Sequence, residues 1–154
     1  MLKWFPTPYP DELLYSVLAR YHVRSGNTSP KMTIEELFGK RTVRSVWDLP
    51  ANLNILLSQL GSYWNANQLI NNHTMYPYYA AFLLPMQEKQ VKKSMLENEG
   101  STIHTRIGVV ASNVKLKTNL WVCSNCINLD METYGETYWR RVHQAPGVFY
   151  LPES

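Results

Sequence analysis

The chain has 154 residues, a formal net charge of +3, 45% hydrophobic residues and 18% charged residues. This balance excludes a disordered chain, and so small a charge does not by itself indicate nucleic-acid binding. No apolar run approaches the roughly 18 residues of a membrane span, and the first residues run into prolines instead of a secretory signal. Two cysteines three residues apart then favour a reducing compartment. We expect a soluble cytoplasmic protein without a membrane partner.

Residues 1–10 are predicted to form a stiff, non-helical arm. Its prolines at positions 6, 8 and 10 fix backbone torsions and bias the preceding residues toward extended conformations. Two roles fit this pattern. The arm is either a strap that packs on the first helix or a peptide that binds a partner, and the candidate partner-binding residues are Trp4, Phe5, Pro6, Pro8 and Tyr9.

The next segments predict a helix-turn-helix arrangement. A first helix opens at Asp11 and ends at Gly26, a second is capped by Thr33 and ends at Gly39, and a third begins at Pro50. This order is expected of a helix-turn-helix unit. The basic segment before the third helix holds the candidate DNA-binding residues Lys40, Arg41 and Arg44, and a solvated basic surface is the alternative.

The remaining segments predict a mainly α fold that ends in a small module. We expect helices at residues 62–71 and 88–99, and a strand at 115–122 that leads into the cysteines. Residues 101–112 fit either a helix or a strand, and the helix is preferred. The predicted organisation is a helical, helix-turn-helix-type domain with its arm at residues 1–112, and a C-terminal zinc-finger-like module at residues 113–154.

The module contains the candidate metal ligands. Cys123 and Cys126 have the spacing of two thiolates that bind one tetrahedral zinc ion, and His143 is the nearest third ligand. No second such pair follows, so the zinc set is incomplete. Two reduced thiols in a packed turn are the alternative, whereas nothing in the sequence places the first thiol at a helix N-terminus, as a redox pair requires.

A further basic pair lies in the same module. Arg140 and Arg141 follow two aromatic residues and are candidate contacts to a phosphate backbone with stacking support. Their alternative role is purely structural.

The ordered motifs resemble the TniQ/TnsD family, the target-selection proteins of bacterial heteromeric transposons. The matching stretches are residues 5–21 (FPTPYPDELLYSVLARY), 37–39 (LFG), 68–70 (QLI), 73–74 (HT), 76–77 (YP), 108–112 (GVVAS), 123–126 (CSNC), 134–141 (YGETYWRR) and 143–144 (HQ). The resemblance implies a DNA-targeting adaptor that carries a helix-turn-helix region and zinc fingers. It also implies recruitment of an AAA+ ATPase and, in some members, a CRISPR effector complex that finds the target.

One departure from the family pattern concerns zinc. The family closes its first finger with a Cys-Pro-x-His set, and the corresponding residues here are Leu151-Pro152-Glu153-Ser154. Both expected ligands are therefore absent.

Two other classes of protein fit the sequence less well. A stand-alone helix-turn-helix transcription regulator would need base-reading side chains, but the third helix offers mainly leucines. A metal-dependent hydrolase would need further ligands. No Ser/His/Asp order, phosphate-binding loop or carboxylate pair is present, so we do not expect an enzyme.

Overall fold

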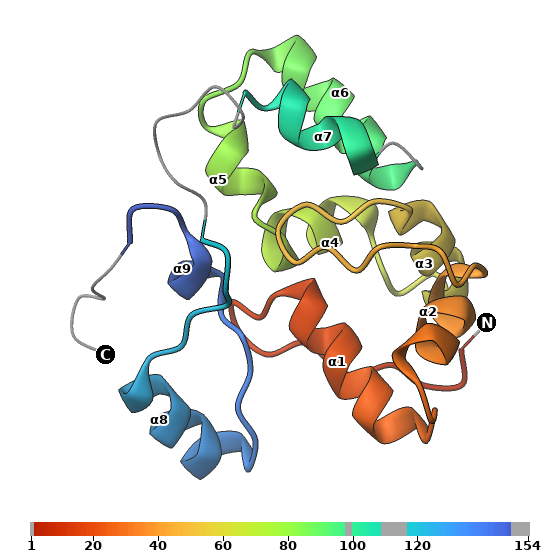
Figure 1. The fold of residues 1–154 in the computed structure, drawn as a ribbon, viewed down its shortest axis with the longest axis vertical. Helices are drawn as coiled ribbons and strands as arrows, with labels where there is room; N and C mark the ends of the chain where they lie inside the picture. Colours follow the sequence, from red (N-terminus) through yellow and green to blue (C-terminus); the bar gives the residue numbers. More distant parts are fainter. Residues whose placement is uncertain (1, 98–99, 109–116, 149–154) are drawn as a thin grey trace.

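The computed structural model describes residues 2–97, 100–108 and 117–148, and the expectation of a mainly α fold is confirmed there (Figure 1). These residues form nine helices and no strand, with one isolated antiparallel bridge between Glu12 and Arg140. The strand expected at residues 115–122 is absent from its described part, 117–122. The helices are α1 Leu14–Ser25, α2 Pro30–Phe38, α3 Leu53–Leu60, α4 Ala66–His73, α5 Tyr76–Ala80, α6 Pro85–Leu96, α7 Gly100–Arg106, α8 Ser124–Tyr134 and α9 Arg141–Gln144.

Helix α1 begins later than the sequence predicts. Its apolar stripe forms the centre of the core, with Leu14 and Val17 essentially inaccessible, and it ends at Gly26 in the left-handed conformation with a φ of 76°. However, Asp11 has a φ of 58° and lies outside the helix. Its carboxylate instead accepts the backbone N–H of Val142 at 3.0 Å, in the first turn of α9. The acidic residue thus caps a helix that is distant in sequence.

Helix α2 is capped by a different residue than expected. Ser29 accepts the backbone N–H of Met32, with Pro30 in the first turn. The predicted cap, Thr33, is buried inside the helix, where its hydroxyl contacts His22 Nδ1 at 2.7 Å. Gly39 ends the helix with a φ of 69°, as the sequence predicts.

The structure does not show the expected helix-turn-helix. Helices α2 and α3 pack against each other, but residues 39–52 connect them, a segment much longer than a turn of about 3–4 residues. The third helix begins at Leu53 rather than at Pro50, because Asn52 adopts a left-handed conformation and donates its N–H to the Glu97 carbonyl at 2.9 Å.

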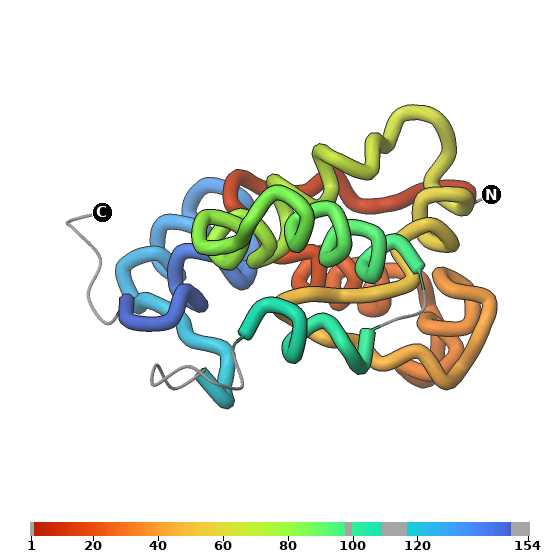
Figure 2. The backbone as a smooth tube through the Cα atoms, turned by 90° about the horizontal axis from the view of Figure 1, so that it is seen from above, coloured from red at the N-terminus to blue at the C-terminus, as the bar shows by residue number. Residues whose placement is uncertain are grey.

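Helices α4 to α7 complete the helical body. Figures 1 and 2 show α6 and α7 side by side on one edge, beyond α5. The predicted helices at 62–71 and 88–99 are displaced, to Ala66–His73 and Pro85–Leu96, and the helix predicted at 101–112 lies at Gly100–Arg106, with 109–112 outside the described residues. Within the part of the chain that the structure describes, no helix has the length and apolar character of a membrane span.

The connection between α8 and α9, together with the first residue of α9, is bound directly to the N-terminal residues. Leu13 donates its N–H to the Trp139 carbonyl at 2.9 Å, and Arg141 donates its N–H to the Asp11 carbonyl at 2.9 Å. The Tyr138 hydroxyl donates to the Pro10 carbonyl at 3.0 Å. The expected boundary between residues 112 and 113 lies outside the described residues, and these contacts connect the segments on either side of it.

Candidate functional site

The first half of the arm packs along the helical body. Leu2 donates its N–H to the Gln59 carbonyl at 2.9 Å, and the Phe5 ring lies between those of Tyr21 and Trp64, with centroid distances of 5.7 and 5.5 Å. Trp4 also contacts Tyr21, at 5.1 Å, but 42% of its surface remains exposed. The structure therefore shows the packing of a strap, and it leaves one large ring of the arm at the surface.

The second half of the arm joins α1 to the C-terminal segment. Tyr9 stacks on Tyr134 at 4.3 Å, lies under the Arg20 guanidinium at 3.9 Å, and donates its hydroxyl hydrogen to Glu136 at 2.6 Å. The Glu136 carboxylate also accepts from Arg20 and Arg24. Burial acts to raise the pKa of Glu136, but the Tyr9 hydroxyl and the two arginines hold it below its ordinary value. Pro6 is buried and Pro8 half-buried along this path.

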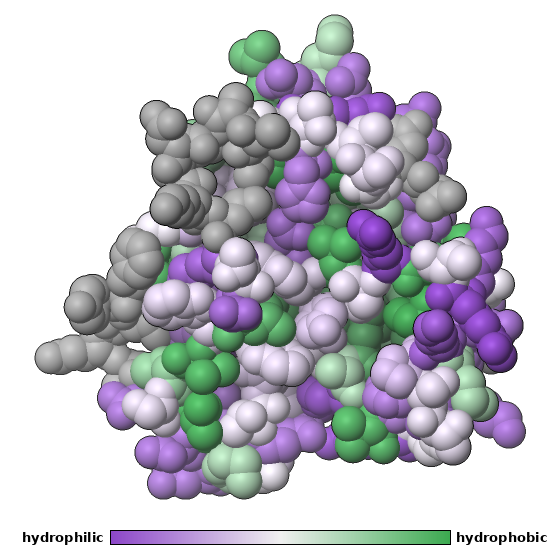
Figure 3. Space-filling model, viewed as in Figure 1, coloured by the Kyte–Doolittle hydropathy of each residue, from purple (hydrophilic) through white to green (hydrophobic). Residues whose placement is uncertain are grey.

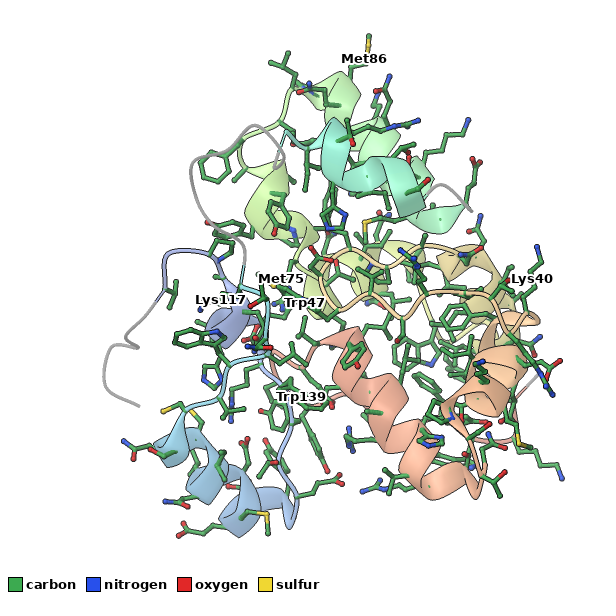
Figure 4. The ribbon with its side chains drawn as sticks, viewed as in Figure 1. Lys40, Trp47, Met75, Met86, Lys117 and Trp139 are labelled. Atoms are coloured by element: carbon green, nitrogen blue, oxygen red, sulfur yellow. The ribbon has the colours of Figure 1, made fainter. Side chains whose placement is uncertain are left out.

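The basic segment is open to solvent. Lys40, Arg41 and Arg44 are exposed on the connection between α2 and α3, and Lys40 lies at the right edge of the molecule in Figure 4. Figure 3 shows strongly hydrophilic side chains at that edge. Arg41 pairs with Glu35 at 2.6 Å, both side chains being about half exposed or more, so water and salt weaken this pair. Arg44 lines a cavity of about 560 Å³ together with His104.

Arg140 and Arg141 are engaged within the fold. Arg140 pairs with the buried carboxylate of Asp130, and its guanidinium lies over the Tyr138 ring at 4.6 Å. Arg141 pairs with Asp11 at 2.9 Å and donates to the Asn71 carbonyl at 2.6 Å. These contacts are the structural role that the sequence left open for both residues.

The cysteines begin a helix instead of forming a turn. Cys123 is the N-cap of α8 and Cys126 is buried in the first turn. The backbone N–H groups of Cys126 and Asn125 lower the pKa of the Cys123 thiol, whereas burial, followed by the neighbouring Cys123, raises that of Cys126. The expectation that the first thiol does not lie at a helix N-terminus is therefore wrong.

The expected ligand set of Cys123, Cys126 and His143 does not assemble. No group of three or more His, Cys, Asp or Glu side chains among residues 2–97, 100–108 and 117–148 is arranged to hold a metal ion. His143 is buried, at 6% exposure, because α9 is fixed on both sides: Lys117 donates to its carbonyl at 2.7 Å, and Gln144 exchanges two hydrogen bonds of 2.9 Å with the Trp121 backbone. Neither ring nitrogen of His143 has a hydrogen-bond partner within the described part of the chain.

Comparison with known proteins identifies the class of protein. The TniQ family model matches residues 3–150, and the chain therefore belongs to the TniQ family.

A particular relative is similar over the same length. The chain is 36% identical over 155 residues to the Transposon Tn7 transposition protein TnsD of Escherichia coli. The match covers 99% of this chain and 30% of the relative, so the chain spans less than a third of that protein's length.

Proposed function

We propose that this chain acts in target-site selection during DNA transposition, as an adaptor between a transposon's AAA+ ATPase and the target. The observation that carries the proposal is the match of the TniQ family model over residues 3–150, together with 36% identity to a Tn7 transposition protein. A binding role is compatible with the exposed side chains of the arm and of the basic segment.

The basic segment is the proposed contact with target DNA. Its three exposed cations, Lys40, Arg41 and Arg44, lie on one connection, where they can approach phosphate groups without breaking a buried contact. Arg140 and Arg141 differ, because binding phosphate would require them to leave Asp130 and Asp11. We therefore assign DNA contacts to Lys40, Arg41 and Arg44, and a role in stabilising the fold to Arg140 and Arg141.

The arm is the proposed contact with the ATPase. Trp4 is its most favourable anchor, since a large aromatic ring that is already held in place loses little conformational entropy on binding. A CRISPR effector complex in place of direct DNA binding would be compatible with the same adaptor role, because the exposed Trp4 ring is not part of the basic segment.

DNA binding is tested by the salt dependence of affinity. Replacing Lys40, Arg41 and Arg44 by Ala should weaken binding similarly for all sequences and flatten the slope of log K against log salt by roughly 0.9 per lost phosphate contact. The matched control replaces Lys89, Lys92 and Lys93 of α6, which removes the same charge elsewhere. An unchanged slope in the first variant would show that this segment does not contact DNA. Tight sequence-specific binding without ATPase capture would instead indicate a stand-alone regulator.

A further inference from the structure

A cavity lies where the connection between α2 and α3 meets the start of α7. Its volume is about 560 Å³, which falls within the range of about 300–1,000 Å³ of sites that bind small organic ligands. His104 Nε2 donates to the Asp48 carboxylate at 2.7 Å, and Figures 1 and 2 show α7 beside the connection. Gly100 permits this close approach, because a Cβ atom there would lie 3.0 Å from that of Ala51. The cavity is therefore bounded by two segments that the fold holds together.

One buried polar side chain in the wall of this cavity is unpaired. Asn52 lines the cavity and is only 6% exposed, yet its side chain caps no helix and has no hydrogen-bond partner among the described residues. Its backbone is fixed in the left-handed region, with a φ of 62° and a hydrogen bond of 2.9 Å to the Glu97 carbonyl. A buried amide normally has partners, because desolvating it without them is unfavourable. A ligand that offers a donor and an acceptor would satisfy this amide.

The other side chains of the lining are apolar or cationic. Apolar side chains form part of the wall, namely Val43, Val46 and Leu49. Arg44 lines the same cavity and is exposed to solvent. His104 also lines it, and the hydrogen bond to Asp48 raises the pKa of His104, but the Asp48 carboxylate balances the charge of the protonated ring. Among the described residues, Arg44 therefore supplies the net positive charge of the lining.

These features match the parts of a nucleotide. A nucleobase has two apolar faces and an edge of neighbouring hydrogen-bond donors and acceptors, with which an asparagine amide can pair. Its phosphate carries the negative charge that a guanidinium binds. Enzymes that extrude a base from a duplex hold that base in the same way, between apolar side chains and polar groups at its edge. A paired base could not enter the cavity, because its edge and faces are covered by its partner and its neighbours.

We propose that the cavity binds one unpaired nucleotide of target DNA, with the base against the apolar wall, its edge on the Asn52 amide and its phosphate on Arg44. The choice of DNA rests on the proposed function, since Arg44 belongs to the basic segment assigned to phosphate contacts. Lys40 and Arg41 continue this segment outside the lining of the cavity, where they can contact neighbouring phosphates. The site would thus bind an exposed base in addition to the backbone.

Three DNA duplexes that share one sequence test the proposal. The first is fully paired, the second carries one bulged adenine, and the third carries an abasic nucleotide at the bulge, so the last two have the same number of phosphates. We expect the full chain to bind the bulged adenine roughly tenfold more tightly than the abasic bulge at the same salt concentration, because only the former places a base in the cavity. Equal affinity for the two bulged duplexes would overturn the inference.

The same measurement separates this inference from the proposed function. If the two bulged duplexes bind equally but the paired duplex binds with the expected dependence on Lys40 and Arg41, the inference fails and the proposed function stands. Absence of binding to all three duplexes would contradict both. Competition by a bulged RNA duplex of the same sequence, or by deoxyadenosine monophosphate at equal concentration, would overturn the choice of target DNA.

Matched variants locate the base. Asn52→Gly removes the amide but suits the left-handed backbone, which glycine adopts readily, so it should bring the two bulged duplexes to equal affinity and keep the helical circular dichroism of the parent. Ser101→Phe, at an exposed position of the lining, should have the same effect by filling the cavity. Thr105→Phe, one turn further along α7 and outside the lining, is its control and should keep the preference. A folded Asn52→Gly variant that still prefers the bulged adenine would contradict the proposed site.

Discussion

At the residue scale, buried polar side chains connect segments that local sequence patterns treat separately. Glu12 is fully buried, and its carboxylate accepts from the Tyr9 N–H, the Ser16 hydroxyl and Arg20, all within 2.9 Å. Burial raises the pKa of Glu12, and these three donors oppose that shift. Because the partners come from the arm and from α1, this one carboxylate links two segments that the local sequence pattern treats separately.

His143 is the exception among these buried groups. Both of its ring nitrogens lack a hydrogen-bond partner within the described residues, and burial, followed by the nearby Arg140, lowers its pKa. An unpaired buried polar group is destabilising by about 1–3 kcal/mol. His143→Leu should therefore raise the denaturant midpoint, by about 1 kcal/mol in the free energy of unfolding once imperfect packing is included.

The adjacent residue is the control for this prediction. Gln144 is also buried, but its side chain makes three hydrogen bonds. It accepts from the Trp121 N–H and donates to the carbonyls of Trp121 and Arg140. Gln144→Leu should thus lower the free energy of unfolding by about 1–3 kcal/mol. A loss of stability in both variants would mean that His143 has a polar partner in solution.

The Asp48–His104 pair makes stability depend on pH. The hydrogen bond to the Asp48 carboxylate raises the pKa of His104 above its ordinary value, although burial opposes the shift. A histidine whose folded pKa is raised stabilises fully below its unfolded pKa of about 6.5, and this contribution is lost as the pH rises through the folded pKa.

A double-mutant cycle between Asp48→Asn and His104→Phe measures that contribution. We expect a favourable coupling free energy of about 1 kcal/mol at pH 5.5 that becomes smaller at pH 8.5. Coupling that is independent of pH would show that the pair does not involve a charged histidine. His73 and His143 have lowered pKa values, so their contributions to stability increase as the pH rises. These contributions are the same in all four proteins of the cycle and therefore cancel.

At the element scale, the sequence predicts the end of a helix correctly where the interaction that ends it is local. Gly26 and Gly39 end their helices as predicted, because a left-handed residue after an amphipathic stripe is a local requirement. The predicted N-cap of α2 was wrong because the sequence contains two candidate caps, Ser29 followed by Pro30 and the capping box that begins at Thr33. Thr33 is buried inside the helix, so Ser29 is the N-cap.

The C-terminal elements were predicted less well for a related reason. The spacing of Cys123 and Cys126 predicts a turn that binds a metal ion. In the structure the two residues instead form the start of α8. Sequence also missed Glu136 and Gln144 as organising residues, since their partners, such as Arg20 and the Trp121 backbone, are distant along the chain. Only the three-dimensional packing reveals such roles.

The two rings of the arm should respond differently to truncation. Phe5 lies between two aromatic rings, so Phe5→Ala should lower the melting temperature, with a loss of about 2–4 kcal/mol in stability. Trp4 is more exposed, so Trp4→Ala should leave the melting temperature nearly unchanged but reduce capture of the AAA+ ATPase in a pull-down. Unimpaired capture by the folded Trp4→Ala variant would remove the arm from the proposed interface.

At the scale of the whole molecule, the arm, α1 and the segment between α8 and α9 form one connected network. The arm, α1 and the segment before α9 meet at Glu136, which accepts from Tyr9, Arg20 and Arg24. The basic segment lies away from this network, on the connection between α2 and α3 (Figures 1 and 4). The proposed adaptor role places the partner contact at Trp4, in the first half of the arm, and the phosphate contact on the basic segment.

The distribution of transposon insertions tests the adaptor role most directly. Insertions would be mapped by sequencing in cells that supply the transposase and AAA+ ATPase of the same transposon, with and without this chain. We expect the chain to concentrate insertions at a defined target, and its Lys40/Arg41/Arg44→Ala variant to disperse them while the α6 lysine variant does not. An insertion distribution that is the same with and without the chain would contradict a role in target-site selection.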